Sequence, residues 1–206
     1  MEDPLSCLQR DPPTKSQYKD LVLTRILVFH ETELRKMAEN NSKLVYLNVS
    51  LTGLRGRHHP ALSYIITANE VRKLRPHLKL LSGDYLTYSR KYEQTKKGSP
   101  LCPLCRQENE TVCHMISTCV AYSDIRSRVL REVEQLLLLS KNSTLNMQML
   151  IENTEILTQF ILDPTSFNLK HRLHLNDPIV EDMFRLSRDL CYSIHNERLR
   201  QIKKIM

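Results

Sequence analysis

The sequence predicts an all-α protein, an irregular helical domain with an embedded Cys3His zinc knuckle. The chain holds only 4 glycines among 206 residues, and its apolar residues recur at the three- to four-residue spacing of amphipathic helices. Aromatic residues make up 6% of the chain and tryptophan is absent, so we expect an aliphatic core between the helices. The knuckle is predicted from four cysteines and a histidine clustered between residues 102 and 119.

The first fifteen residues are predicted to form a disordered lead. They contain three prolines and few apolar side chains, too few to anchor a folded segment. The acidic start lacks the apolar stretch of a signal peptide. Nowhere does the sequence reach the roughly 18 consecutive apolar residues that a membrane span needs. We therefore expect a protein of the nucleus or cytoplasm that is not secreted and contacts no membrane.

Residues 16–98 are predicted to be a basic helical region that forms one compact unit with the rest of 16–206. A helix is expected over residues 17–40, and residues 44–66 are expected to be a loop with short helical turns. The apolar positions that predict the first helix are Leu21, Ile26, Phe29, Leu34 and Met37.

The next predicted helix begins after Thr67, because Thr67 with Glu70 three residues later has the spacing of a capping box. Gly83 is expected to end this helix. Pro76 lies inside the pattern and is expected to kink or split the helix. A short helix over residues 86–94 then leads towards the cysteine cluster.

Three helices are predicted in the C-terminal helical region, residues 127–206. The first ends near Ser140, the second covers residues 147–162, and a proline-bounded connection follows. The last begins at the sequence Asn-Asp-Pro of residues 176–178, a strong helix start signal, and runs towards Lys204.

The segment 99–126 is predicted to bind zinc. Cys102 and Cys105 are separated by two residues, so a tight turn can direct both sulfurs at one ion. His114 and Cys119 are separated by four and can return from a short helix. Three thiolates and one imidazole form a closed tetrahedral set, which is typical of structural zinc.

Alternatives to this ligand set concern the cysteines themselves. A redox pair is disfavoured because no strand and helix flank the Cys-x-x-Cys turn. Cys113 could replace His114 as a ligand, although neighbouring residues on a helix face different directions. Cys7 and Cys191 are expected to be bystanders. A catalytic zinc is not supported, because no His-x-Glu base precedes the Pro-Leu-Cys sequence.

The cluster resembles the zinc-binding segment downstream of the reverse transcriptase in non-LTR (LINE-type) retrotransposon polyproteins. That segment has a Cys-x-x-Cys turn, a Glu-Thr-x-x-His-Met core, a further cysteine, and then a tyrosine and an arginine. The positions that match here are Cys102, Cys105, Glu110, Thr111, His114, Met115, Cys119, Tyr122 and Arg126. The sharp similarity covers about 30 residues and a diffuse one extends from about Leu44 to the end.

This resemblance implies a role in handling template RNA or target DNA during retrotransposition. The chain departs from the parent polyproteins, because it contains no Tyr-x-Asp-Asp polymerase motif and no endonuclease or RNase H carboxylate set. We therefore expect no enzymatic activity and no small-molecule substrate.

Positive charge is concentrated between Gly53 and Lys97. This segment has ten basic and three acidic residues, a net charge that equals the +7 of the whole chain. Four tyrosines lie within it, Tyr64, Tyr85, Tyr88 and Tyr92, so stacking on bases is one reading and packing on the core is the other. The predicted nucleic-acid contacts, including one in the knuckle, are Arg55, Arg57, Arg72, Lys73, Arg75, Lys79, Arg90, Lys91, Lys96, Lys97 and Arg106.

The expected partner is therefore RNA or DNA, bound through its phosphate backbone. The alternative is a helical protein-interaction module, a domesticated retroelement fragment in which zinc is only structural.

Overall fold

The computed structural model describes residues 14–41, 44–47, 59–63, 67–139, 147–165 and 177–205, and within them it contains helices and no β-strand. The predicted all-α class is thereby confirmed for the described residues. The helical segments are α1 (Lys15–Glu39), α2 (Pro60–Ser63), α3 (Ala68–Leu81), α4 (Tyr88–Thr95), η3 (His114–Thr118), η4 (Val120–Tyr122), α5 (Ser123–Leu139), α6 (Met147–Glu152), α7 (Thr154–Leu162) and α9 (Asp177–Ile205). No described helix has the length and apolar character needed to cross a bilayer.

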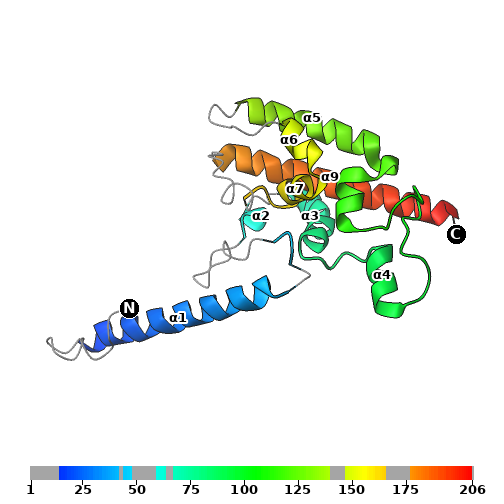
Figure 1. Cartoon of the computed structure of the whole chain (residues 1–206). Coiled ribbons are helices and arrows are strands. Elements are labelled where there is room, and N and C mark those ends of the chain that lie inside the picture. The colour runs from blue at the N-terminus through cyan, green and yellow to red at the C-terminus, as the bar shows by residue number, and fades with distance from the viewer. Residues whose placement is uncertain are drawn as a thin grey trace.

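The long helix α9 is the centre of the bundle (Figure 1). Helices α3 and α5 make the most extensive contacts with α9, and α7 packs against α9, α3 and η3. The fully buried side chains include Leu80 of α3, Phe160 of α7 and Leu190 of α9. Most buried apolar residues are aliphatic, as the composition predicts, because leucine, isoleucine, valine and methionine make up most of the core.

Helix α1 lies apart from this bundle (Figure 1). Thr14 caps it through a capping box with Gln17, and its range agrees closely with the predicted 17–40. The described members of the apolar stripe that predicts this helix, Leu21, Ile26, Phe29 and Met37, are exposed and lie outside the core. Among the large apolar side chains described in α1, the most exposed are Met37 at 70%, Phe29 at 63% and Tyr18 at 61%.

Helix α3 confirms one local prediction and corrects another. Thr67 and Glu70 form the predicted capping box, and Gly83 adopts a left-handed φ of 67° just beyond the helix. Pro76, expected to kink or split the helix, does not split it and is a buried residue within one continuous α3. A proline removes one backbone hydrogen bond, and the packing of α3 against α9 compensates for that loss.

The predicted helix over residues 147–162 is two helices, α6 and α7. Asn153 separates them because its side chain accepts a hydrogen bond from the backbone N–H of Ile156, at 3.1 Å, and caps α7. The other predicted ends agree with α4, α5 and α9 to within two residues. Most of the predicted disordered lead, and of the loop over residues 44–66, lies outside the described residues.

Candidate metal centre and basic surface

A short turn of the backbone places Cys102 and Cys105. The amide of Cys102 donates to the carbonyl of Glu108 at 2.8 Å, and the amide of Arg106 donates back to the carbonyl of Cys102 at 2.9 Å. Arg106 therefore closes the turn, and it does so with a left-handed φ of 57°. That conformation disfavours side chains other than glycine, so the turn carries local strain that its hydrogen bonds must offset.

A single π-helical turn, η3, places the other two members of the cluster. The amide of Cys119 donates to the carbonyl of His114 at 2.8 Å, which is the i to i+5 bond that defines this helix. The wider turn closed by this bond brings Cys119 back beside His114, whereas residues five apart diverge on an α-helix. The four-residue spacing between His114 and Cys119 therefore brings both side chains to the same side.

The turn and η3 together assemble the predicted Cys3His cluster. One possible ligand atom from each of Cys102, Cys105, His114 and Cys119 lies within 4.8 Å of the other three. The sulfurs of Cys102 and Cys119 are 3.8 Å apart, and the sulfur of Cys105 lies 3.3 Å from Nε2 of His114. Cys102, His114 and Cys119 are buried, so these four residues could hold a metal ion away from solvent.

Two of the sulfurs, those of Cys102 and Cys119, lie within hydrogen-bond distance of each other. A hydrogen bond from Cys119 lowers the pKa of Cys102 to about 4, and the same contact, followed by burial, raises the pKa of Cys119. This contact therefore favours the thiolate form of Cys102, which is the form that ligates metals. A cation at the centre would favour deprotonation of its partner as well.

The second ring nitrogen of His114 is held by two side chains that the sequence analysis does not single out. Nδ1 lies 2.9 Å from a carboxylate oxygen of Glu108 and 2.9 Å from the hydroxyl of Thr118. The hydrogen bond from His114, followed by that from Thr118, lowers the pKa of Glu108. A carboxylate at Nδ1 fixes the proton on that nitrogen and leaves Nε2 free as a ligand. Such a carboxylate is the usual outer partner of a metal-bound histidine.

Cys113 is not a member of the cluster. Burial raises the pKa of its thiol, and hydrogen bonds link the thiol to Thr158 and Thr154 of α7. His114 therefore occupies the position for which Cys113 was the alternative. Cys191 is fully buried in α9 and burial raises its pKa, as expected of a bystander, whereas Cys7 lies outside the described residues.

Glu110 connects the cluster to α9. Its carboxylate is fully buried and accepts two hydrogen bonds from the Arg198 guanidinium, both at 2.8 Å. The backbone amide of Tyr88 donates to the same carboxylate at 2.7 Å. Arg198 is therefore held by a bidentate ion pair to a buried acid, although it lies near the basic C-terminal end of α9. Glu110 itself belongs to the Glu-Thr-x-x-His-Met core that the sequence shows. Its partner Arg198 lies 88 residues further along the chain, so the ion pair could not be predicted from the motif.

The predicted basic contacts fall into different environments. Arg72, Arg75 and Lys79 are exposed along α3. The structure gives none of these three an ion pair with a described carboxylate. The other exposed members are Lys91, Lys96, Lys97 and Arg106.

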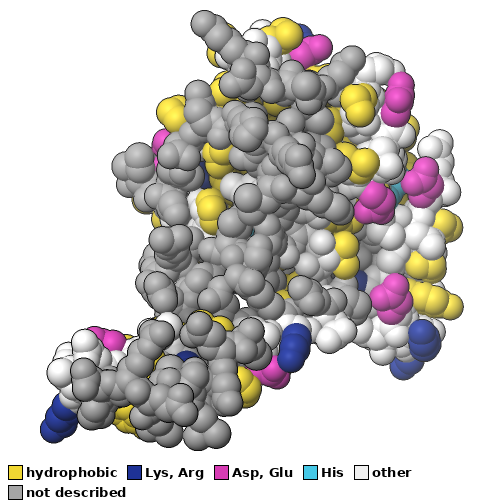
Figure 2. Space-filling view, turned by 60° about the vertical axis from the view of Figure 1, so that its left-hand side comes forward, with side chains coloured by type: hydrophobic (Ala, Val, Ile, Leu, Met, Phe, Trp, Pro, Cys, Tyr) yellow, Lys and Arg dark blue, Asp and Glu magenta, His cyan; other side chains and the backbone are white. Residues whose placement is uncertain are grey.

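Two of the predicted contacts are neutralised within the chain. Lys73 lies 2.5 Å from Asp189 and Arg90 lies 3.2 Å from Asp84, so each has less charge to offer a phosphate. Arg55 and Arg57 lie outside the described residues. On the face drawn in Figure 2, the basic side chains stand singly or in small groups among acidic and apolar ones.

The tyrosines of the basic segment are divided between core and surface. Tyr85 is buried, which favours packing over base stacking, and Tyr64 lies outside the described residues. Tyr92 is 37% exposed, and the ammonium of Lys96 lies 6.0 Å from its ring centre. Tyr88 is half-buried beneath the guanidinium of Arg198, 5.6 Å from the ring centre.

A pocket between α3 and α9 groups three cations of α3, which have no carboxylate partner among the described residues, with side chains of α9 that are not among the predicted contacts. Its volume is about 320 Å³. The lining residues are Arg72, Arg75, Pro76, Lys79, Tyr192, His195 and Asn196. The lining residues of α3 and those of α9 are more than 110 positions apart in the sequence, so only the contact between the two helices creates this grouping and no local pattern could predict it.

Comparison with protein-family models, with curated proteins and with solved structures found no match to this chain.

Proposed function

We propose that the Cys3His cluster binds one structural Zn²⁺ ion. Two sulfurs that share a tetrahedral zinc, each about 2.3 Å from the ion, lie about 3.8 Å apart, and a sulfur and a nitrogen lie about 3.6 Å apart. The corresponding distances in this chain are 3.8 and 3.3 Å. Three thiolates suit zinc better than the hard cations, which take oxygen ligands.

With four protein ligands the coordination shell is complete. A catalytic zinc keeps one position for water or substrate. This arrangement therefore favours a structural zinc site that stabilises the fold of the knuckle over a catalytic one. The net charge of three thiolates, one imidazole and Zn²⁺ is −1, and Glu108 adds a further carboxylate beside it. Direct contact between the ligands and nucleic-acid phosphates is therefore disfavoured, and the contacts are expected on the neighbouring helices.

The function that these residues support best is nucleic-acid binding, by a non-catalytic module similar to the region downstream of a LINE-type reverse transcriptase. The observation that carries this proposal is the row of cations on α3, Arg72, Arg75 and Lys79, which have no described carboxylate partner. Cations left unneutralised by their own protein raise the local positive potential and attract phosphates. No described feature supports the reading of base sequence.

The test is a salt titration of binding, measured by fluorescence anisotropy on a single-stranded RNA and on a DNA duplex. Each phosphate that the protein neutralises contributes about −0.9 to the log–log slope on duplex DNA and about −0.7 on single strands. We expect a clear negative slope that becomes shallower when Lys91, Lys96 and Lys97 are replaced together by alanine. Binding that is absent, or insensitive to salt, would contradict the proposal.

A second candidate function is protein interaction through α1. The exposed apolar side chains Phe29, Met37 and Tyr18 of this helix favour it, because exposed apolar faces often mark protein contacts. This candidate predicts that a chain without α1 still binds zinc and loses its partner. Nucleic-acid binding that persists unchanged in the chain without α1 would assign the two functions to different parts of the molecule.

A further inference from the structure

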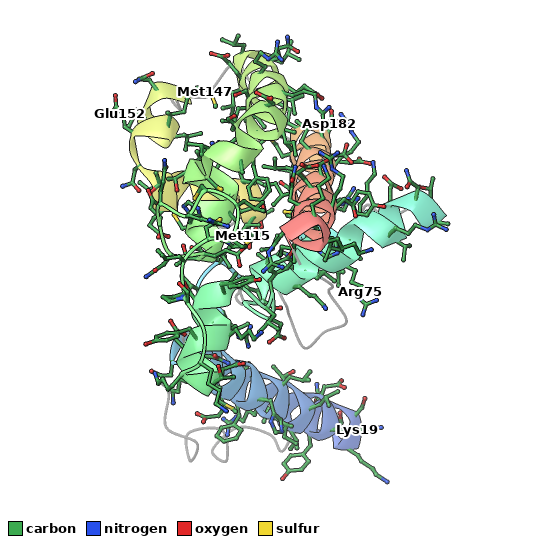
Figure 3. The ribbon with its side chains drawn as sticks, turned by 90° about the vertical axis from the view of Figure 1, so that its right-hand side faces the viewer. Lys19, Arg75, Met115, Met147, Glu152 and Asp182 are labelled. Carbon is green, nitrogen blue, oxygen red and sulfur yellow. The ribbon has the colours of Figure 1, made fainter. Side chains whose placement is uncertain are left out.

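The pocket between α3 and α9 has a lining of unusual charge. Arg72, Arg75 and Lys79 are spaced three and four residues apart along α3, so they lie on one face of the helix. No acidic residue is among the residues that line the pocket. Figure 3 shows Arg75 on α3 near the place where this helix passes α9.

Lys73 on the same helix provides an internal comparison. Its ammonium is paired with Asp189 of α9 at 2.5 Å. Helix α9 therefore provides a carboxylate partner for one cation of α3. The structure gives Arg72, Arg75 and Lys79 no such described partner, although all three line the pocket beside the same helix α9. An arrangement of this kind leaves three positive charges for an anion from outside.

Helix α9 completes the pocket with polar groups of a different type. Tyr192, His195 and Asn196 occupy positions three and four residues apart, again on one helix face. The hydroxyl of Tyr85 lies 2.8 Å from Nδ1 of His195. Burial raises the pKa of this phenol to about 12, so Tyr85 keeps its proton. Burial, followed by the charges of Arg198, Lys79 and Arg75, lowers the pKa of His195.

We propose that this pocket is a phosphate-binding site, in which Arg72, Arg75 and Lys79 neutralise the anion and His195 and Asn196 donate hydrogen bonds to its oxygens. Tyr85 donates to Nδ1 of His195 and thereby leaves the proton of the neutral ring on Nε2 as a donor. The ring of Tyr192 provides the surface against which the attached sugar or base lies. The inference rests on the proposed function in one respect, that the phosphate belongs to a nucleic acid.

The first experiment measures the salt dependence of oligonucleotide binding by the zinc-loaded chain. The double variant Arg75→Ala/Lys79→Ala removes two of the three cations, and Arg128→Ala/Arg131→Ala on the exposed side of α5 is the matched control. We expect the pocket variant to flatten the log–log slope by about 1 to 2 units and the control to leave it unchanged. Equal effects of the two variants would overturn the pocket as a site.

The second experiment uses inorganic phosphate as the probe and observes His195 directly by NMR of a chain with isotope-labelled histidine. Phosphate, compared with chloride at the same ionic strength, is expected to shift the His195 ring resonances in the wild type and not in Arg75→Ala/Lys79→Ala. His195→Gln identifies the signal. Absence of any shift with phosphate and with oligonucleotide would overturn the proposal, even if the variant loses stability.

Two further outcomes separate this proposal from the proposed function. Salt-dependent oligonucleotide binding without a response of His195 overturns the pocket and leaves nucleic-acid binding intact. A phosphate response of His195 without any oligonucleotide binding supports the pocket and overturns the nucleic-acid source. Oligonucleotides with a 5′-phosphate and with a 5′-hydroxyl distinguish the sources: tighter binding of the former supports a terminal phosphate, and equal binding supports a backbone phosphate.

Discussion

At the scale of single residues, the Cys3His cluster is the part of this protein that the sequence predicts best. The spacing of Cys102, Cys105, His114 and Cys119 is sufficient to select the four residues that the structure brings together. The partners of His114 were not predicted, because Glu108 and Thr118 are ordinary surface residue types whose importance depends on where the histidine ring points. Ligand spacing is local information, whereas a hydrogen bond to a ring nitrogen is set by the folded turn.

Loss of a predicted ligand should release the ion. We expect Cys105→Ser and His114→Ala to lower the zinc content of the purified chain from one equivalent to nearly none, because a three-coordinate remnant binds zinc weakly. The matched control is Cys113→Ser, which removes a neighbouring thiol outside the cluster and should retain one equivalent. Zinc content can be measured by metal analysis after dialysis. Full retention in His114→Ala would mean that Cys113 takes its place.

Glu108 allows a finer test. Glu108→Gln keeps the shape of the side chain but removes the charge that holds the Nδ1 proton, so zinc affinity should fall by about 10- to 100-fold while the stoichiometry stays at one. A competition titration with a chelator of known affinity measures this change. Gln107→Glu adds a charge at the adjacent exposed position and is expected to leave affinity nearly unaltered. An unchanged affinity in Glu108→Gln would show that Thr118 alone orients the ring.

At the scale of helices, the sequence predicts which segments are helical better than it predicts where each helix ends or how deeply it is buried. The capping box at Thr67 and Glu70 is a local motif and is found as expected. Pro76 and Asn153 are local signals too, but tertiary packing keeps the proline inside α3, and a side-chain cap lets a break occur after Glu152. Apart from the spacing between His114 and Cys119, no feature of the sequence indicates that the π-helical turn η3 forms there.

Truncation at the two ends of the chain is expected to affect stability unequally, because α1 lies apart from the bundle and α9 is at its centre. None of the described side chains of α1 belongs to the buried core, so removal of residues 1–41 should leave the midpoint of urea unfolding of the remaining chain nearly unchanged. Removal of residues 198–206 from the other end should lower that midpoint strongly, because Arg198 is lost. Circular dichroism at increasing urea concentration measures both. A large loss of stability in the chain without α1 would show that α1 packs on the bundle.

At the scale of the whole molecule, the pair Glu110–Arg198 fixes the knuckle to α9. Arg198→Ala leaves a buried carboxylate without its partner, which should lower the free energy of unfolding by about 3–5 kcal/mol. Arg200→Ala removes an exposed arginine two residues further along α9, whose described ion pair is with Glu197, and it should have little effect. The double variant Glu110→Gln/Arg198→Met is expected to recover much of the loss. Urea denaturation measures all three, and additive losses would contradict the coupling.

The buried histidine of α3 makes the stability of the whole fold depend on pH. Burial lowers the pKa of His77 to about 4, from 6.5 in an unfolded chain. The unfolded chain therefore binds a proton first as pH falls, and stability decreases between about pH 6.5 and pH 4, by about 1.4 kcal/mol per unit and about 3 kcal/mol in total. The contribution is fully present above pH 6.5.

A comparison of the wild type with His77→Gln isolates this contribution, because acid also protonates the thiolates of both chains equally. We expect the wild type to lose more stability than the variant between pH 7 and pH 5, measured by urea denaturation at each pH. Parallel curves for the two chains would mean that His77 takes up its proton without unfolding.

The distance in sequence between Glu110 and Arg198 also has a consequence for synthesis. The two residues are 88 positions apart, and ribosomes add about 5–20 residues per second, so the carboxylate is made on the order of 4–18 seconds before its guanidinium. During that interval a nascent knuckle with its zinc ligands complete still has an acid that cannot be buried without cost. The final docking of the knuckle must therefore wait until Arg198 has been synthesised, and a message that stops short of codon 198 produces a chain in which the buried Glu110 has lost its arginine partner.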